Sequence, residues 1–131
     1  MSCRDCSLCK VRGNKCPSLS QDCGRVLLMG NPNVGKSVFF SRLTGTHALS
    51  SNYPGTTVGF TEGTMRYGGK TARLIDVPGA YTLDPTNEAE MIARRILNDG
   101  ADVVILVIDA TALERNLVMA MQVLEHRIPV V

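Results

Sequence analysis

The stretch Gly30-Asn31-Pro32-Asn33-Val34-Gly35-Lys36-Ser37 decides the fold, because it fits the phosphate-binding pattern G-x-x-x-x-G-K-S/T. An apolar run, residues 26–29, precedes it, and a helical pattern follows. Backbone N–H groups must wrap a phosphate chain in such a loop, and glycines at 30 and 35 permit the conformations this requires. Lys36 adds a mobile positive charge, the Ser37 hydroxyl can ligate Mg²⁺, and the helix N-terminus attracts the anion. The alternative is a chance glycine-rich turn before a helix.

Composition limits the remaining possibilities. The chain has 131 residues, of which 44% are hydrophobic and 20% charged, so it is one globular domain or part of one. A net charge of +2 is too small to indicate nucleic acid or an anionic membrane surface as the main partner. No apolar stretch approaches the roughly 18 residues of a membrane span, and the N-terminus lacks the apolar core of a signal peptide. We therefore expect this chain by itself to be soluble and cytosolic.

The cysteines are confined to one end. All five lie in the first 23 residues, and the composition changes at Gly24, so we expect a Cys-rich extension over 1–23 and a folded unit over 24–131. The number of cysteines is odd, and the phosphate-binding motif is typical of intracellular proteins. Both observations argue against a disulfide framework. The Cys-x2-Cys-x2-Cys spacing indicates thiolate ligands for zinc or an iron–sulfur cluster, while a disordered tail with free thiols remains the alternative. The candidate ligands are Cys3, Cys6, Cys9, Cys16 and Cys23.

Apolar periodicity predicts alternating strands and helices after Gly24. The predicted strands cover 25–30, 58–66, 71–75, 103–108 and 128–131. Gly68-Gly69 predicts an antiparallel hairpin between the second and third of these, and residues 46–57 are predicted to be a polar loop. The β-branched run 103–108 predicts a central strand covered on both faces.

Three helices are predicted between these strands. The first covers 36–44, and the second covers 88–98 with Asn87 as its N-cap and Glu90 three residues on. The third follows a predicted Thr111-x-x-Glu114 capping box. It carries four apolar residues on one side: Leu113, Leu117, Met121 and Leu124.

This order predicts an α/β fold of the P-loop NTPase type, with a mostly parallel sheet and one antiparallel strand. Because the chain stops inside a predicted strand, we expect the domain to be incomplete at its C-terminus. Phosphate would lie at the carboxyl ends of the parallel strands.

Two further motifs favour a GTPase, of the Ras-like and translation-factor-related kind, over a generic P-loop ATPase. Asp76-Val77-Pro78-Gly79 follows an apolar strand about 40 residues after the loop, so that Asp76 can hold the Mg²⁺ shell and the Gly79 N–H can reach the γ-phosphate. Thr56-Thr57 ends the polar loop, where a switch threonine completes Mg²⁺ coordination. We favour Thr57, although β-propensity would explain either threonine equally well.

Hydrolysis at this site would proceed by in-line attack of water on the γ-phosphoryl group, with Lys36 and Mg²⁺ neutralising the developing charge. Many GTPases place a glutamine directly after Asp-x-x-Gly to orient that water. Ala80 occupies this position here. We therefore predict slow intrinsic turnover.

Four blocks of the sequence together resemble the ferrous-iron transport protein B family. They are residues 30–37, Asn52-Tyr53-Pro54-Gly55-Thr56-Thr57-Val58, Asp76-Val77-Pro78-Gly79-Ala80-Tyr81-Thr82-Leu83 and Asp109-Ala110-Thr111-Ala112-Leu113-Glu114-Arg115-Asn116-Leu117. The resemblance covers 24–131. It implies the N-terminal, cytoplasmic GTPase domain of a larger bacterial inner-membrane Fe²⁺ transporter. It also implies potassium activation, with Asn33 helping to bind K⁺ beside the phosphates; a turn-forming role for Asn33 is the alternative.

The same resemblance implies partners and shows departures. The partners are guanine nucleotide, a helical regulatory domain, a membrane permease domain and small iron-transport accessory proteins. The chain ends at Val131, before the family's guanine-reading Asn-x-x-Asp motif, so we expect reduced guanine selectivity. The resemblance does not explain residues 1–23. Two alternatives remain open: a soluble GTPase of ribosome assembly or tRNA modification, and a metal-sensing module whose P-loop only tethers nucleotide.

Overall fold

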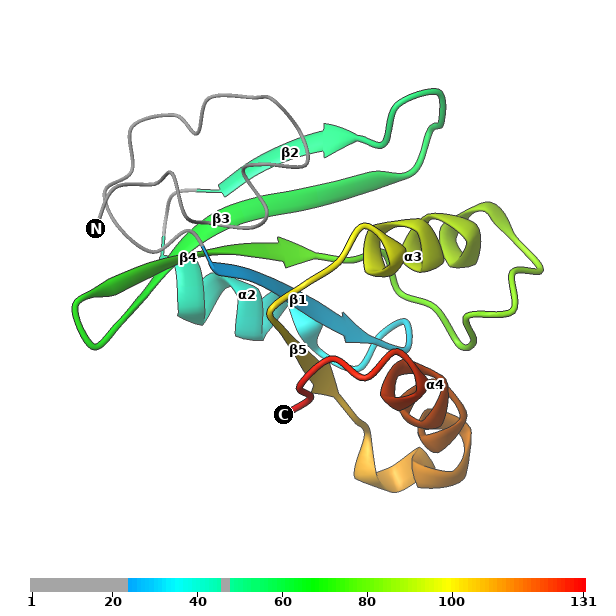
Figure 1. Ribbon diagram of the computed structural model, residues 1–131. Helices are drawn as coiled ribbons and strands as arrows, with labels where there is room; N and C mark the ends of the chain where they lie inside the picture. The colour runs from blue at the N-terminus through cyan, green and yellow to red at the C-terminus, as the bar shows by residue number, and fades with distance from the viewer. Residues whose placement is uncertain (1–23, 46–47) are drawn as a thin grey trace.

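A five-stranded mixed sheet organises the chain (Figure 1). The structure is a computed structural model that describes residues 24–45 and 48–131. The strand order is β2-β3-β4-β1-β5, and β1 pairs in parallel with both β4 and β5. β3 runs antiparallel to both of its neighbours, which confirms the predicted sheet and its hairpin. The strands are β1 (Gly24–Gly30), β2 (Ala48–Asn52), β3 (Gly59–Tyr67), β4 (Lys70–Asp76) and β5 (Val103–Val107).

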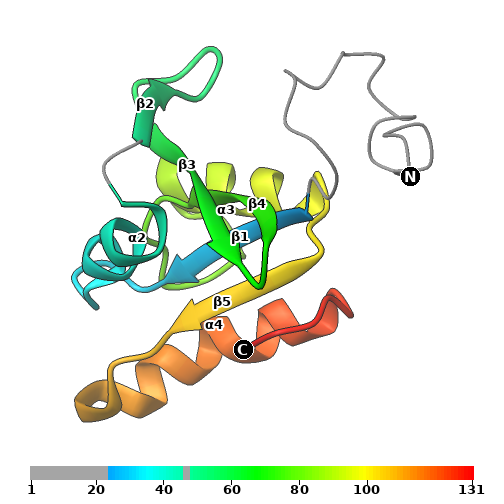
Figure 2. The same ribbon diagram turned by 90° about the vertical axis from the view of Figure 1, so that its left-hand side faces the viewer.

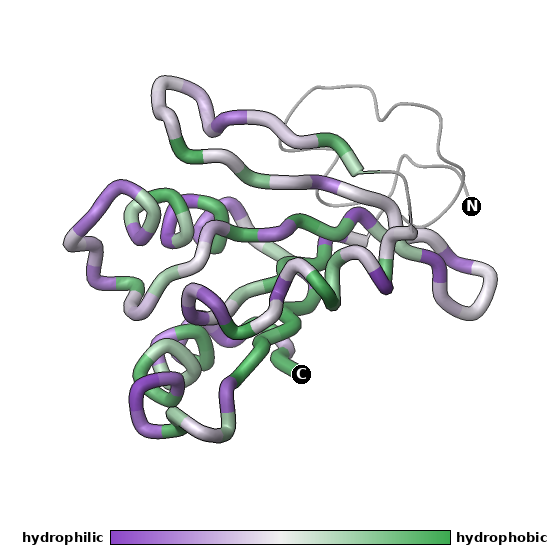
Figure 3. The backbone as a smooth tube through the Cα atoms, turned by 180° about the vertical axis from the view of Figure 1, so that it is seen from behind, coloured by the Kyte–Doolittle hydropathy of each residue, from purple (hydrophilic) through white to green (hydrophobic). Residues whose placement is uncertain are grey.

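Helices cover both faces of the sheet, as Figure 2 shows from the side. Helix α2 (Lys36–Thr44) packs through Phe40 on one face, against Val26, Leu28 and Leu74. Helices α3 (Glu88–Asn98) and α4 (Leu113–Glu125) cover the other face. In Figure 3 the strongly hydrophobic segments gather near the C-terminal end, beside the middle of the sheet. Predicted bounds for α2 and α3 are confirmed residue for residue.

Strand β2 corrects the prediction of a structureless loop at 46–57. Its sequence, Ala-Leu-Ser-Ser-Asn, is exposed along its whole length, and it forms the edge of the sheet by pairing with β3. A strand with neither face buried shows no apolar alternation, so periodicity could not reveal it. The consequence for function is that the segment before Thr56 is tied to the sheet and only residues 53–58 form the connecting loop.

Strand β5 contributes side chains to the core on both faces of the sheet, as predicted, but it is less buried than a fully covered central strand. It is the last strand in the sheet order of the described residues, and only Val104 in it is fully buried. Helix α2 packs chiefly on β1, β3 and β4, which leaves that face of β5 half-exposed. On the outer edge of β5, Val104 forms a parallel bridge with Val130, in agreement with a strand beginning near residue 128.

The start of α4 differs from the predicted capping box. The Asp109 carboxylate accepts hydrogen bonds from the Thr111 N–H at 2.9 Å and the Thr111 hydroxyl at 2.6 Å. These bonds cap a 3₁₀ turn over Ala110–Ala112 that contains Thr111. Helix α4 therefore begins after this turn, at Leu113, and has no side-chain cap. The four apolar residues predicted on one side of this helix are exposed, and the buried face consists of Asn116, Met119, Ala120 and Val123.

Both ends of α3 are closed by side chains. The Asn87 Oδ1 accepts from the Glu90 N–H at 2.9 Å, which confirms the predicted N-cap. The Glu90 carboxylate accepts from the N–H and the hydroxyl of Thr86, one residue before the N-cap. At the other end the Arg25 guanidinium donates to the Gly100 and Ile96 carbonyl oxygens, at 2.7 and 3.3 Å.

None of the helices in the described residues is long and apolar enough to span a membrane. The five cysteines of the extension, with the metal site predicted for them, lie outside the described residues.

Candidate nucleotide-binding site

The loop from Gly30 to Ser37 joins the carboxyl end of β1 to the first turn of α2. A Cβ atom at position 30 would lie 2.6 Å from the Val107 carbonyl oxygen, so only glycine allows β1 and β5 to approach here. Gly35 has a φ of 92° and Asn33 a φ of 64°, both in the left-handed region. The chain thereby curls back before α2, and the free N–H groups of the first helical turn face the concave side of the loop.

Lys36 and Asp76 meet across this loop. The Lys36 Nζ lies 3.0 Å from the Asp76 Oδ1, and their side chains are only 12% and 17% exposed. Asp76 ends β4, which is the parallel neighbour of β1, so adjacent strand ends bring the two motifs together. The predicted convergence of the two motifs is therefore found in the structure.

The segment after Asp76 lies directly on the loop. The Val77 N–H donates to the Leu28 carbonyl at 3.0 Å, and the Ala80 N–H donates to the Gly30 carbonyl at 3.3 Å. A Cβ atom at Gly79 would lie 2.9 Å from the Pro32 Cα. Glycine is therefore required at 79 for contact between the two loops, beyond any contact it makes with phosphate.

Ala80 is 1% exposed, so a side chain at this position points into the protein. The site thus lacks a polar group where many GTPases orient the attacking water. This burial supports the expectation of slow turnover.

The two switch threonines are placed differently. Thr56 is engaged in a turn, where its hydroxyl donates to the Tyr53 carbonyl at 2.9 Å. Thr57 is exposed, and its hydroxyl lies 3.5 Å from the Glu88 Oε2 at the start of α3. Thr57 is therefore the freer of the two, but in this conformation it contacts α3 and not Asp76.

Ser37 and Asn33 are both exposed beside the loop. Ser37 is in the first turn of α2, next to Lys36, where its hydroxyl can reach a metal bound to phosphate. In the described ranges, 24–45 and 48–131, no three His, Cys, Asp or Glu side chains gather closely enough to hold a metal. A serine hydroxyl, one carboxylate and phosphate oxygens form the donor set typical of Mg²⁺, so the residues present fit that ion.

Helix α4 holds the loop that follows Gly79, a relationship that the sequence motifs did not reveal. The Gln122 Oε1 accepts from the Leu83 N–H at 2.7 Å and the Thr82 hydroxyl at 2.9 Å, and its amide donates to Asp84 at 2.9 Å. The Arg115 guanidinium lies 5.2 Å from the centre of the Tyr81 ring, a cation–π distance. Four consecutive loop residues are therefore fixed to one helix.

Hydrogen bonds lower the pKa of two carboxyl groups near these loops. The Thr86 hydroxyl and N–H hold the pKa of Glu90 below its ordinary value, against the opposing effect of burial. The Thr111 hydroxyl and N–H likewise lower the pKa of Asp109. Both carboxylates stabilise turns that lead into helices, and neither contacts the phosphate loop.

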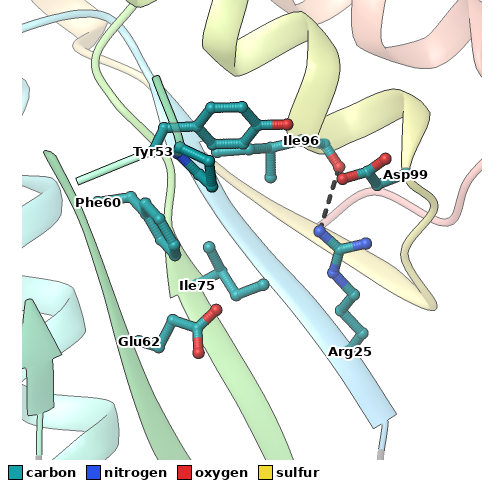
Figure 4. Close-up of a pocket in the computed structure, with 8 residues that line it drawn as sticks. Arg25, Tyr53, Phe60, Glu62, Ile75, Ile96 and Asp99 are labelled. Atoms are coloured by element: carbon teal, nitrogen blue, oxygen red, sulfur yellow. Dashed lines mark hydrogen bonds between the residues drawn. The ribbon is translucent and has the colours of Figure 1, made fainter. Parts of the chain in front are cut away.

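A pocket of about 250 Å³ lies on the α3 side of the sheet, away from the phosphate loop (Figure 4). Tyr53 and Phe60 stand edge to face there, with ring centres 6.3 Å apart. The guanidinium of Arg25, which donates to the Ile96 carbonyl, lies at the opposite wall. The pocket therefore holds Tyr53, the first residue of the loop 53–58 that carries Thr56 and Thr57.

A phosphate-binding loop between a strand and a helix, a facing Asp-x-x-Gly segment and a mixed sheet with β3 reversed define the G domain of a P-loop GTPase. The family model described as "Ferrous iron transport protein B" matches residues 24–131. The chain belongs to this family.

Curated relatives agree with the family match. The Fe(2+) transporter FeoB of Methanocaldococcus jannaschii is 46% identical over 101 residues, which are 76% of this chain and 15% of the relative. The FeoB of Escherichia coli is 42% identical over 107 residues, or 78% of this chain and 14% of the relative. The chain thus spans about one seventh of the length of these relatives.

Solved structures agree on the fold. The G domain of the T. maritima FeoB iron transporter superposes with a TM-score of 0.79 at 44% identity, covering 83% of this chain and 69% of that one. A GDP form of the T. maritima cytosolic domain gives a TM-score of 0.78 at 43% identity, over 83% and 43% of the two chains. The cytosolic domain of L. pneumophila FeoB gives 0.77 at 39% identity, over 82% and 43%.

Proposed function

We propose that this chain binds guanine nucleotide with Mg²⁺ and hydrolyses GTP slowly. The observation that carries the proposal is the approach of Lys36 to Asp76 at the ends of two adjacent parallel strands, beside a loop whose glycines leave room for phosphate. The partly buried ammonium group provides a positive charge where phosphate would bind, and the carboxylate lies where a metal bound to that phosphate would need a ligand.

In the proposed reaction, a water oxygen attacks the γ-phosphorus as the bond to the β–γ bridging oxygen breaks, which releases GDP and phosphate. The Lys36 ammonium neutralises charge on the departing and transferred oxygens, and the N–H groups at the start of α2 bind the remaining phosphates. The Gly79 N–H provides a donor toward the γ-phosphate. Ala80 is buried and has no polar side-chain atom, so we assign it no part in orienting the attacking water.

Mg²⁺ would be held by Ser37 and Asp76, with Thr57 added if the switch segment leaves Glu88. The ion supplies a positive charge that stabilises the transferred phosphoryl group. We further propose that Asn33, exposed beside the loop, holds K⁺ through its amide oxygen and so supplies the charge that other GTPases take from an arginine.

Titration with a fluorescent GDP analogue, in the presence and absence of Mg²⁺, tests this function. We expect Mg²⁺-dependent binding that unlabelled GTP displaces, and a loss of Mg²⁺ dependence in Ser37→Ala. The exposed serine Ser50, on β2, gives a matched control as Ser50→Ala. Absence of nucleotide binding by the unmutated chain would contradict the proposal.

At the level of the whole protein, we propose that the domain regulates Fe²⁺ uptake from the cytoplasmic side of a bacterial inner membrane. Support comes from the family match and from relatives described as Fe(2+) transporters. The proposed partners are a membrane permease domain, a helical regulatory domain and small accessory proteins. Iron uptake by cells that carry Lys36→Ala in the chromosomal gene would test this role, with reduced uptake expected.

For the extension we propose thiolate coordination of zinc or an iron–sulfur cluster by Cys3, Cys6, Cys9, Cys16 and Cys23, with an iron- or redox-sensing role. The sequence spacing supports it. Metal analysis of protein purified without oxygen should find stoichiometric metal that Cys3→Ser and Cys6→Ser together remove. Metal-free protein would favour free thiols.

A further inference from the structure

Asn31 is a buried residue whose side chain lacks partners. It is 2% exposed, and neither its Oδ1 nor its Nδ2 makes a hydrogen bond within the described part of the chain. Each buried polar atom left unpaired costs about 1–3 kcal/mol, and native proteins contain few of them. A buried amide at this position therefore calls for a partner that the described residues do not supply in this conformation.

The position of Asn31 indicates where that partner lies. Its predecessor Gly30 accepts the 3.3 Å hydrogen bond from the Ala80 N–H, and its successor Pro32 contacts Gly79. Both chain neighbours of Asn31 thus touch segment 77–80. The Val77 and Ala80 N–H groups of this segment already donate to Leu28 and Gly30, and Pro78 has no N–H, so the segment offers its backbone carbonyl oxygens as acceptors.

Segment 77–80 directly follows Asp76, the carboxylate to which the proposed function gives a second partner, Mg²⁺. Asp76 is paired with Lys36 at 3.0 Å in this conformation. Under the proposed function, phosphate would attract the ammonium group and Mg²⁺ would attract the carboxylate, at the residue that directly precedes this segment.

We propose that Asn31 is a positioning residue for nucleotide recognition. When a nucleoside triphosphate occupies the loop, the Asn31 Nδ2 donates to a backbone carbonyl oxygen of segment 77–80 and thereby holds the Gly79 N–H toward the γ-phosphate. The role differs from that of Asn33, which is exposed. The inference rests on the proposed function, because it requires that the loop binds nucleotide.

Asn116 provides an internal comparison. It is also 2% exposed, but its Oδ1 accepts from the Asp109 N–H at 3.2 Å and its Nδ2 donates to the Ala112 carbonyl at 2.9 Å. Leucine has a similar shape and no polar atoms. Asn116→Leu removes existing hydrogen bonds, whereas Asn31→Leu removes only unpaired groups from the nucleotide-free protein.

The test measures two quantities in the full chain: the urea midpoint of the nucleotide-free protein, and the ratio of affinities for GTPγS and GDP with Mg²⁺. For Asn31→Leu we expect an unchanged or higher midpoint and an affinity ratio about tenfold lower, the equivalent of one lost hydrogen bond. For Asn116→Leu we expect a lower midpoint and an unchanged ratio.

Several outcomes would overturn the proposal. A ratio in Asn31→Leu within twofold of the unmutated value would remove the role in recognition. A lower midpoint with an unchanged ratio would show that a buried water satisfies the amide in the free protein. If Asn31→Leu does not fold, Asn31→Ser is measured in the same way. Failure of both variants to fold would also overturn the proposal, because it would show that the amide is already needed in the free protein. If the unmutated chain binds neither nucleotide, the proposed function itself fails.

Discussion

The Asp76 Oδ1 lies 3.0 Å from the Lys36 Nζ, so an ion pair joins the two motifs that define the site. In the proposed function, nucleotide with Mg²⁺ would give each side chain a stronger partner: phosphate for the Lys36 ammonium group and the metal for the Asp76 carboxylate. Opening this pair is therefore part of binding.

The role of Asp76 predicts how Mg²⁺ affects affinity. The unmutated chain should bind GTPγS at least tenfold more tightly with Mg²⁺ than with EDTA, and Asp76→Asn should lose this difference because an amide is a poorer ligand for a hard cation. Competition titrations under both conditions measure it. Glu114→Gln, at an exposed carboxylate in α4, is the control and should keep the Mg²⁺ response.

Contact between Gly79 and Pro32 predicts a strong effect of one methyl group. Gly79→Ala places a carbon 2.9 Å from the Pro32 Cα, which forces the two loops apart. We expect the free energy of unfolding to fall by about 1–3 kcal/mol. We also expect the variant to lose more affinity for the nucleoside triphosphate than for the diphosphate. In the matched control, Gly24→Ala, the added carbon meets its nearest neighbour at 3.7 Å and should be tolerated. Equal stability of the two variants would contradict the close contact.

Glu90 predicts a loss of stability in acid. Its pKa in the folded protein lies below the ordinary value of 4.5 because Thr86 donates two hydrogen bonds to the carboxylate. The stabilisation is present above the pKa of the unfolded chain and is lost as the pH falls through the folded pKa. Glu90→Gln should cost about 1 kcal/mol at pH 7 and less at pH 3, measured by urea unfolding.

The neighbouring carboxylate supplies the control for that measurement. Glu88 lies in the same first turn of α3 but is exposed and does not accept from Thr86. Glu88→Gln should leave the pH dependence of unfolding close to that of the unmutated chain. A cost of Glu90→Gln that is the same at pH 3 and pH 7 would contradict the assignment.

Gln122 predicts a local change in the loop after Gly79. Gln122→Ala removes the acceptor of the Leu83 N–H and the donor to Asp84, so hydrogen exchange at the Leu83 amide should accelerate by about tenfold. Gln122→Glu keeps an acceptor for Leu83 and should largely preserve its protection. Unchanged exchange in the alanine variant would show that α4 does not hold this loop.

Local signals explain which parts of the fold could be predicted. Gly45 marks the end of α2, and Asn87 marks the start of α3. The phosphate-loop motif also requires a strand before it and a helix after it, which are β1 and α2. Strand β2 has no apolar signal, because neither of its faces is buried. The capping box at Thr111 failed because Asp109, two residues earlier, accepts from the Thr111 N–H and hydroxyl, which places Thr111 inside a 3₁₀ turn ahead of α4.

The site shows the same division. The sequence predicted that the phosphate loop and the Asp76 motif would emerge at the same edge of the sheet, where adjacent parallel strands end. The contacts of Gln122 with residues 82–84 depend on how α4 packs 38–40 positions further along the chain, and no local pattern encodes them. The unpaired amide of Asn31 likewise becomes visible only when the packing around the loop is known.

Phosphate release from GTP by the purified chain, with Mg²⁺ and with either K⁺ or Na⁺, tests the central claim most directly. We predict slow release that K⁺ accelerates, and that Asn33→Ala removes the acceleration while nucleotide binding persists. Release that is the same in both cations would contradict the role of Asn33, and no release above that of Lys36→Ala would contradict the assignment of GTP hydrolysis to this site.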